Sequence, residues 1–122
     1  MTWLYQGKEL VDSDIPPKSG GFIYLITHKK SGKRYLGRKL LTKASRRQKN
    51  KKIIKTRVES DWRTYWSSSP ELQEEVDRLG EDQYTREILI FAKMRGELNY
   101  LEERFLYSLG VLEKDGWYNS LS

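Results

Sequence analysis

Residues 22–37 contain two strand-like runs joined by a short turn, and this segment restricts the possible folds more than any other part of the chain. Residues 22–28 (FIYLITH) are mostly β-branched or aromatic over the length of a typical strand. A turn-forming KKSG stretch follows, and residues 33–37 (KRYLG) form the second run. We therefore expect an antiparallel β-hairpin. Because alternate side chains share a face and cross-strand pairs lie ~5 Å apart, Tyr24 and Tyr35 can approach each other on it.

Three further elements are predicted in the second half of the chain. Ser69 and Pro70 are residue types preferred at the N-cap and the first position of a helix, which we expect to end at Gly80. Residues 84–91 (YTREILIF) are typical of a third strand. Residues 97–109 carry apolar side chains at helical spacing. This order predicts an α+β fold with a small three-stranded, largely antiparallel sheet flanked by helices.

The length of the chain, 122 residues, allows one modest hydrophobic core, so we expect residues 1–122 to form a single domain. Residues 1–20 contain turn-forming residues and are expected to form an N-terminal arm or a short hairpin. Residues 40–58 form a basic insertion, whose scattered apolar residues favour one or two short helices around a loop at 48–52. Adjacent like charges oppose folding, so we expect this insertion to be the most mobile part of the free protein.

The charge of the chain is concentrated in one segment. The formal net charge is +6, but residues 29–58 carry fourteen basic and no acidic side chains, whereas residues 59–122 carry seven basic and fourteen acidic ones. Such an imbalance produces one strongly positive face, which is typical of proteins that bind a polyanion, and nucleic acid is the leading candidate. The alternatives are a solvated basic loop, a localisation-type tract and a surface for an acidic protein partner.

The composition excludes several classes of site. The chain contains no Cys and a single His, His28, which rules out disulfides, thiolate nucleophiles and iron–sulfur clusters and disfavours a zinc centre. No apolar run approaches the ~20 residues of a membrane span. The N-terminus (MTWLYQGKEL) lacks the basic-then-apolar order of a signal peptide. We therefore expect a cytoplasmic protein that does not bind membranes.

The spacing of a few residues resembles a known family. The tripeptide FIY ends at Tyr24, the tripeptide YLG begins eleven residues later at Tyr35, and Glu102 and a YN pair ending at Asn119 follow. This order resembles the GIY-YIG nuclease superfamily. With its GFIYLIT, YLGRK, ESDW, WSSSPEL and WYN segments, the chain looks most like small phage-encoded, Seg-like GIY-YIG homing endonucleases, and the resemblance covers residues 20–119.

The resemblance implies an enzyme that cleaves phosphodiester bonds in DNA with one divalent metal ion, Mg²⁺ (or Mn²⁺). It assigns activation of the attacking water to Tyr24, assistance to Tyr35, phosphate contact to Arg38, metal ligation to Glu102 and closure of the site to Asn119. A phenol titrates at about 10, so Tyr24 needs a neighbouring cation or a metal-bound water to act as a base near neutral pH. One carboxylate is enough to hold Mg²⁺, which keeps most of its waters.

The identity of the metal ligand is open between two neighbouring carboxylates. Glu102 lies about 50° from the centre of the apolar arc of its predicted helix, whereas Glu103 lies about 150° away. Glu102 is also followed by apolar residues three and four positions later, Phe105 and Leu106, as in the family pattern. We therefore prefer Glu102 and keep Glu103 as the alternative.

The identity of the catalytic arginine is also open. Members of the family usually place an Arg about ten residues after the second motif tyrosine and a His or Tyr one helical turn further. At the position of the Arg this chain has Ser45. We assign the role to Arg46, the next residue, with Arg47 as its neighbour. Arg57 and Tyr65 fill these positions instead if the chain carries a longer insertion.

The remaining cations of the basic segment are expected to contact the phosphate backbone of DNA. They are Lys39, Lys43, Arg47, Lys49, Lys51, Lys52, Lys55 and Arg57. The sequence thus predicts a divalent-metal-dependent DNA endonuclease, probed by Mg²⁺-dependent nicking of a plasmid. The alternative is a catalytically weak or inactive nucleic-acid-binding module with the same fold. The sequence does not determine the cleavage site, whether one or both DNA strands are cut, the preferred DNA shape or the oligomeric state.

Overall fold

Five strands form the central sheet in the computed structural model, which describes residues 2–111 and 116–119. The strands of the protein are β1 (Leu4–Tyr5), β2 (Lys8–Glu9), β3 (Gly21–His28), β4 (Arg34–Leu40), β5 (Thr42–Lys49), β6 (Lys52–Glu59) and β7 (Tyr84–Ala92). The helices are α1 (Pro70–Leu79) and α2 (Arg95–Ser108), with 3₁₀ turns η1 (Asp12–Asp14), η2 (Trp62–Thr64) and η3 (Glu81–Gln83). The side chains of Arg47 and Lys49 lie outside the described part.

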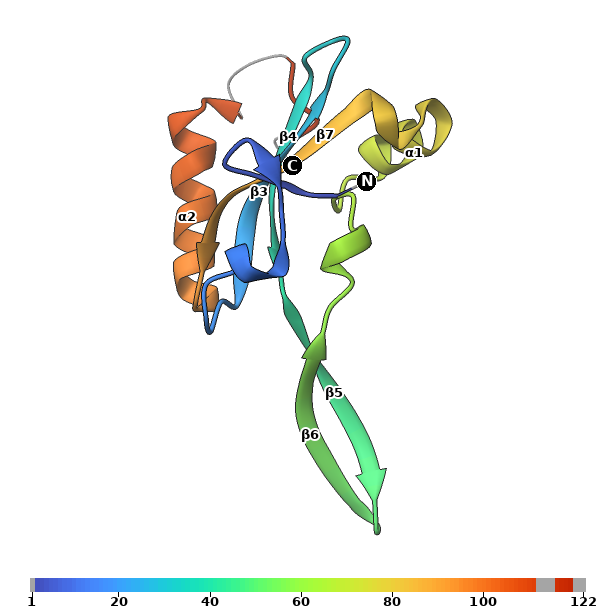
Figure 1. Cartoon of the computed structure of the whole chain (residues 1–122), viewed down its shortest axis with the longest axis vertical. Coiled ribbons are helices and arrows are strands. Elements are labelled where there is room, and N and C mark those ends of the chain that lie inside the picture. The colour runs from blue at the N-terminus through green and yellow to red at the C-terminus, as the bar shows by residue number, and fades with distance from the viewer. Residues whose placement is uncertain (1, 112–115, 120–122) are drawn as a thin grey trace.

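The sheet has the order β2-β1-β7-β3-β4 and is larger than the predicted three strands. β3 pairs antiparallel with both β4 and β7, which confirms the predicted centre of the sheet, whereas β1 pairs parallel with β7. The additional strands β1 and β2 form a short N-terminal hairpin. They lie within residues 1–20, where an arm or a short hairpin was expected, but the sequence did not indicate that β1 joins the sheet beside β7. The α+β fold with flanking helices is as predicted (Figure 1).

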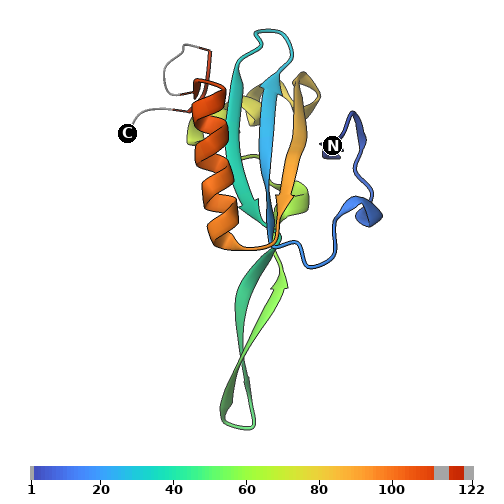
Figure 2. The same ribbon diagram turned by 90° about the vertical axis from the view of Figure 1, so that its left-hand side faces the viewer.

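Residues 40–58, for which the sequence predicted short helices and a loop, contain most of a two-stranded β-hairpin. β5 pairs with β6 along the full length of both strands, and the hairpin stands away from the rest of the protein (Figure 1 and Figure 2). The helical prediction is wrong because half of the residues of β6 are β-branched and favour a strand. Asn50 and Lys51 adopt φ values of 51° and 62°, as a tight two-residue hairpin turn requires, so the turn is shorter than the predicted loop.

Hydrophobic side chains cover both faces of the sheet. One face carries Tyr24 and packs against Trp3, Trp62 and the inner side of α1. The other face carries Ile23 and packs against Leu98 of α2. Figure 2 shows α2 lying along this second face. Because neighbouring residues of β3 point to opposite faces, the strand contributes to both cores.

Helix α1 begins and ends where the sequence predicted. The Ser69 side chain accepts a hydrogen bond from the backbone N–H of Leu72 at 3.3 Å, and Pro70 is the first helical residue. Gly80 ends the helix with a φ of 100°, which a residue without a side chain adopts at little cost. Helix α2 begins at Arg95, slightly earlier than predicted. Within the described ranges, neither helix is both long and apolar enough to cross a membrane.

Candidate active site

The register of the β3–β4 hairpin brings two tyrosines to the same face of the sheet. Tyr24 lies opposite Gly37, and Tyr35 lies opposite Ile26, which is two residues along β3 from Tyr24. The two ring centroids are 6.1 Å apart, with 31° between the ring planes. Tyr24 is only 1% exposed, whereas Tyr35 is half-buried. The two rings therefore approach each other as the predicted hairpin requires.

Gly37 leaves the space that the ring of Tyr24 occupies. A β-carbon at position 37 would lie 2.5 Å from Cζ of Tyr24 and 2.9 Å from Cε1 of Tyr35, closer than van der Waals contact permits. Gly37 does not have a positive φ, so the requirement for glycine here is steric. The absence of a side chain at this position thus sets where the Tyr24 hydroxyl lies.

A third tyrosine, Tyr65, joins the pair from the segment after η2. Its ring centroid lies 6.0 Å from that of Tyr24, with the rings edge to face at 87°. Nη1 of the buried Arg86 donates a hydrogen bond to the Tyr65 carbonyl oxygen at 2.7 Å, which fixes the backbone. Nζ of Lys39 lies 4.0 Å from the centre of the Tyr65 ring. Tyr65, considered in the sequence only for a longer insertion, therefore lies beside the first motif tyrosine.

Burial keeps the tyrosine hydroxyls protonated. It raises the pKa of Tyr24 far above the usual value, and Tyr35, Tyr65 and the Glu102 carboxylate raise it further. Burial also raises the pKa of Tyr35, although a hydrogen bond with Oγ of Ser68 at 3.0 Å opposes this. Both groups are therefore neutral phenols at pH 7. Tyr35 thus lies between the buried Tyr24, 6.1 Å away between ring centroids, and the exposed Ser68.

Glu102 of α2 lies next to Arg38 of β4. Its Oε1 is 3.8 Å from Nε of Arg38, and its side chain is 26% exposed. Burial raises the pKa of the Glu102 carboxyl, Arg38 lowers it, and Glu103 raises it. The charge of Glu102 raises the pKa values of Tyr24 and Tyr35, whereas Glu103 is exposed to solvent. The fold thus places Glu102, the preferred candidate, beside Arg38 and near enough for its charge to act on both tyrosine hydroxyls.

The carboxylate of Glu102 is suited to hold a metal ion together with substrate. Within the residues that the structure describes, no three or more His, Asp or Glu side chains gather into a complete metal site. Mg²⁺ typically binds one or two protein carboxylates and completes its shell with waters and a substrate phosphate, and Mn²⁺ has a similar preference. At 3.8 Å, Arg38 makes no direct hydrogen bond that would occupy the carboxylate oxygen. The donor set therefore fits Mg²⁺ or Mn²⁺.

Asn119 connects the C-terminal segment to β4. Its Oδ1 accepts a hydrogen bond from the Leu36 N–H at 3.0 Å, and its Nδ2 donates to the Leu36 carbonyl oxygen at 2.8 Å. The N–H of Tyr118 donates to the carbonyl oxygen of Arg34 at 2.7 Å. These bonds hold β4 on both sides of Tyr35. Asn119 therefore holds β4 next to the second motif tyrosine; its closing role in the site stays a prediction.

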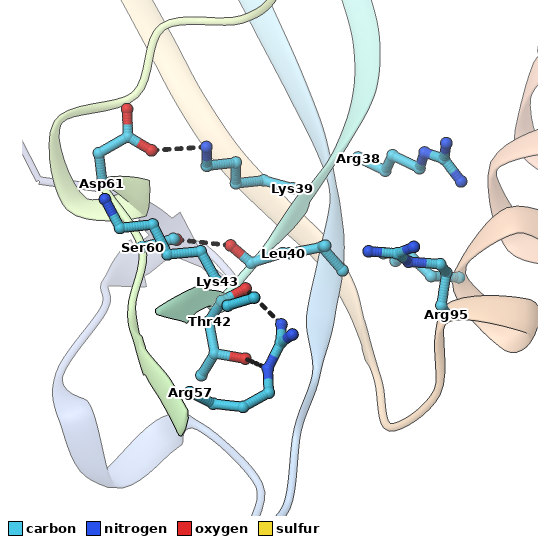
Figure 3. Close-up of a pocket in the computed structure, with 11 residues that line it drawn as sticks. Arg38, Lys39, Leu40, Thr42, Lys43, Arg57, Ser60, Asp61 and Arg95 are labelled. Carbon is cyan, nitrogen blue, oxygen red and sulfur yellow. Dashed lines mark hydrogen bonds and ion pairs between the residues drawn. The ribbon is translucent and has the colours of Figure 1, made fainter. Parts of the chain in front are cut away.

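A basic cleft of about 560 Å³ opens beside Arg38, at the base of the β5–β6 hairpin (Figure 3). Three arginines line it: Arg38 from β4, Arg57 from β6 and Arg95 from α2. Nε of Arg57 donates to Oγ1 of Thr42 at 3.0 Å, and its Nη2 donates to the Thr42 carbonyl oxygen at 2.8 Å. Arg57 is therefore held in place before any ligand binds.

The predicted DNA-contacting cations separate into two groups. Lys39, Lys43 and Arg57 line the cleft. Lys51, Lys52 and Lys55 lie farther out along the hairpin and are exposed, as is Arg46, the residue assigned as the catalytic arginine. Arg47 and Lys49 belong to β5, but the predictions made for their side chains fall outside the described part of the structure.

The fold distinguishes between the candidates for the catalytic arginine. Arg57 pairs with Ala44 across the hairpin, whereas Arg46 pairs with Lys55, two residues farther from the sheet. Arg57 therefore shares a cleft with Arg38, and Arg46 lies farther out along the hairpin. Sequence reasoning missed Arg95, because nothing in its local sequence indicates that the start of α2 faces β4 and β6.

One family model, "Putative endonuclease segE, GIY-YIG domain", matches residues 3–121. No curated protein and no solved structure gives a significant match. The matched region includes the tyrosine pair of the β3–β4 hairpin, Glu102 of α2 and Asn119. It confirms the GIY-YIG resemblance, and a nuclease domain acts on a nucleic acid. The chain therefore belongs to the family of segE-like GIY-YIG endonuclease domains.

Proposed function

We propose that this protein is a divalent-metal-dependent DNA endonuclease that hydrolyses a phosphodiester bond with a tyrosine-activated water. The observation that carries the proposal is the approach of Tyr24 to Tyr35, 6.1 Å between ring centroids, with Glu102 close enough for its charge to raise the pKa of both tyrosines. Glu102 in turn lies 3.8 Å from Arg38, which lines the basic cleft. DNA is proposed as the nucleic acid because the fourteen cations of residues 29–58 match the dense charge of a duplex backbone.

Arg38, Arg57 and Arg95 provide the cationic wall for the scissile phosphate. An arginine keeps its charge at every physiological pH and can bind two phosphate oxygens with parallel N–H bonds. Arg57 is already fixed by its two hydrogen bonds to Thr42, so little ordering is needed when phosphate binds. Because negative charge on the phosphate oxygens develops during attack, fixed cations stabilise the transition state more than the bound substrate.

Glu102 is the residue that would hold Mg²⁺ or Mn²⁺. When bound, such an ion acts as a Lewis acid that stabilises negative charge on a phosphate oxygen. Arg38 lowers the pKa of the Glu102 carboxyl and so opposes the rise that burial causes. This favours the ionised carboxylate that metal ligation requires.

Tyr24 cannot serve as a preformed phenolate, because burial holds its pKa far above neutral pH. We infer that Tyr24 accepts a proton from the attacking water while it passes its own proton to Tyr35. Tyr35 passes a proton to Ser68, and Ser68 releases one to solvent. Every hydroxyl ends neutral, the water oxygen bonds to phosphorus, the bond to the leaving oxygen breaks, and the leaving oxygen takes a proton from solvent. This relay gives buried phenols a role that needs no stable phenolate.

Nicking of a supercoiled plasmid tests the proposal. We expect the protein to convert supercoiled DNA to nicked or linear forms with Mg²⁺ or Mn²⁺ and to leave it intact in EDTA. Tyr24→Phe, which removes the proton-accepting oxygen, should lower the single-turnover rate by roughly 10²- to 10⁴-fold. Tyr107→Phe is the matched control, because Tyr107 is 88% exposed on α2. It should cut at the wild-type rate.

Binding measured in parallel identifies the alternative function. A protein that binds duplex DNA but does not nick it with either metal would be a catalytically inactive binding module. The observation that favours this alternative is that the chain has Ser45 where the family usually has an arginine. Equal rates for Tyr24→Phe and Tyr107→Phe would contradict the tyrosine mechanism while leaving a nuclease activity in place.

A further inference from the structure

The β5–β6 hairpin is a long two-stranded ribbon exposed to solvent. Each strand has eight residues, and at roughly 3.3 Å per residue the ribbon is about 26 Å long. Every residue of β6 is exposed. Figure 1 and Figure 2 show that the ribbon extends beyond the sheet and both helices. An isolated two-stranded hairpin is only marginally stable in water, so contact with a binding partner would stabilise this ribbon.

The base of the ribbon is firmly attached to the protein. Ser60 donates its hydroxyl proton to the Leu40 carbonyl oxygen at 2.6 Å and its N–H to the Leu41 carbonyl oxygen at 2.9 Å. Nζ of Lys39 lies 2.6 Å from Oδ1 of Asp61 just after the ribbon. The direction of the ribbon relative to the basic cleft is therefore set by the fold, so a duplex bound in the cleft would meet it at a defined position.

The charge of the ribbon selects a polyanion as the partner. Residues 42–59 include eight Lys or Arg and a single acidic residue, Glu59. Glu59 lies at the base, where it accepts hydrogen bonds from Nε1 of Trp62 at 2.9 Å and Nε of Arg63 at 2.8 Å. All charged residues in the outer part of the ribbon are therefore positive. A duplex carries about one charge per 1.7 Å of its axis and provides the complementary charge.

Some residues of the ribbon are not explained by phosphate binding. Ile53 is 65% exposed and Ile54 is 44% exposed, close to the tip. Gln48 lies directly opposite Ile53, and Arg46 lies directly opposite Lys55, so these four residues occupy one face. Arginine, glutamine and apolar side chains are the types that contact guanine, adenine and the thymine methyl group. This face therefore has the composition of a base-reading surface.

We propose that the β5–β6 hairpin enters the major groove of duplex DNA, where Arg46, Gln48, Ile53 and Lys55 contact base edges and give the enzyme its sequence preference. The inference rests on the proposed function, which makes duplex DNA the substrate. The major groove is about 12 Å wide and admits a two-stranded ribbon, whereas the minor groove is about 6 Å wide. The same face carries Arg57, which lines the cleft. Cleavage and recognition are thereby linked through one strand, β6.

Selection from a library of randomised duplexes tests the inference with the full chain in EDTA, where the proposed cleavage does not occur. We expect wild type to enrich a defined sequence and to protect guanine N7, a major-groove atom, from dimethyl sulfate. Ile53→Ala or Gln48→Ala should lower affinity for the enriched duplex roughly 5- to 150-fold and leave affinity for random duplex unchanged. Ile54→Ala, on the opposite face, is the matched control and should change neither affinity.

A phosphate-contacting cation should behave differently from the base-contacting face. Lys52→Ala should weaken binding to all duplexes alike and reduce the salt dependence of log affinity by about one unit. All these positions are exposed, and the melting temperature of each variant shows whether the fold is intact.

Four results would overturn the inference: no enriched sequence, equal losses for Ile53→Ala and Ile54→Ala, displacement of the protein by the minor-groove ligand netropsin, or self-association through the ribbon. Sedimentation without DNA detects the last. Nicking is measured separately. If the Ile53→Ala variant still cuts and keeps the wild-type sequence preference, this inference is refuted and the proposed function stands. If the protein enriches a sequence but does not cut, the proposed nuclease function is refuted and recognition by the hairpin stands.

Discussion

Replacement of Gly37 by alanine tests the link between packing and catalysis. The added β-carbon would lie 2.5 Å from Cζ of Tyr24, whereas ordinary contact begins at 3.4 Å, so the ring must move by about 1 Å. Tyr24 is 1% exposed and in edge-on contact with Trp3 and Tyr65, at 5.5 and 6.0 Å between centroids. The ring therefore has little space to move into.

The two consequences of Gly37→Ala are measured separately. Overpacking of this kind costs about 1–3 kcal/mol of unfolding free energy, which lowers the melting temperature by roughly 4–15 °C. Displacement of a reacting group by about 1 Å lowers the rate on the order of 10²-fold. The assays are urea denaturation and single-turnover plasmid cleavage, the latter below the melting temperature of the variant.

Gly96→Ala is the matched control, because a β-carbon at position 96 in the first turn of α2 meets no atom within 4 Å. It should keep the wild-type rate and gain about 0.5–1 kcal/mol of stability. A Gly37→Ala variant with wild-type stability would refute the packing argument. A variant that is destabilised but cuts at the wild-type rate would show that the position of the Tyr24 hydroxyl does not matter for cleavage.

Three further predictions concern other contacts of the site. Asn119→Ala leaves the N–H and carbonyl of Leu36 without their partners and should cost about 2–3 kcal/mol in urea denaturation; an unchanged midpoint would contradict the positioning role. Burial raises the pKa of Glu75, but hydrogen bonds from two tyrosine hydroxyls bring it below its ordinary 4.5, so the ionised carboxylate stabilises the fold above pH 4.5 and this stabilisation is lost as the pH falls below it. Glu75→Gln should lack this part of the pH dependence of unfolding, and identical profiles would argue against it. Arg38→Gln removes the cation that lowers the pKa of Glu102, so the acid limb of kcat/KM should move to higher pH, and an unmoved limb would show that Glu102 does not titrate there.

Local sequence patterns were sufficient to predict most of the scaffold. A run rich in β-branched and aromatic residues, followed by a turn and a second short run, predicted the β3–β4 hairpin, and the Ser69-Pro70 start and the Gly80 end predicted α1. These elements are determined by neighbouring residues, so a pattern reports them directly. The hairpin of β5 and β6 was missed because its charges follow no clear period, and its strand character lies in β-branched residues that also fit a short apolar helix face.

The site was predictable only where the family spacing applies. Tyr24, Tyr35 and Glu102 were named from the sequence; the two tyrosine rings approach each other, and the charge of Glu102 acts on both hydroxyls. The neighbours Arg57 and Arg95 depend on tertiary structure: the cross-strand register brings Arg57 to the base of the hairpin, and the packing of α2 brings Arg95 to the same cleft. No local pattern in a single sequence contains that register.

The most direct test of a metal-dependent nuclease centred on Glu102 is the single-turnover cleavage rate of Glu102→Gln beside that of Glu103→Gln, in Mg²⁺ and at equal DNA occupancy. The two substitutions remove one carboxylate charge each from adjacent positions of α2, one beside Arg38 and one in solvent. We predict that Glu103→Gln cuts at nearly the wild-type rate and that Glu102→Gln binds DNA but does not cut measurably. Equal rates for the two variants, or cutting by wild type in EDTA, would contradict this mechanism.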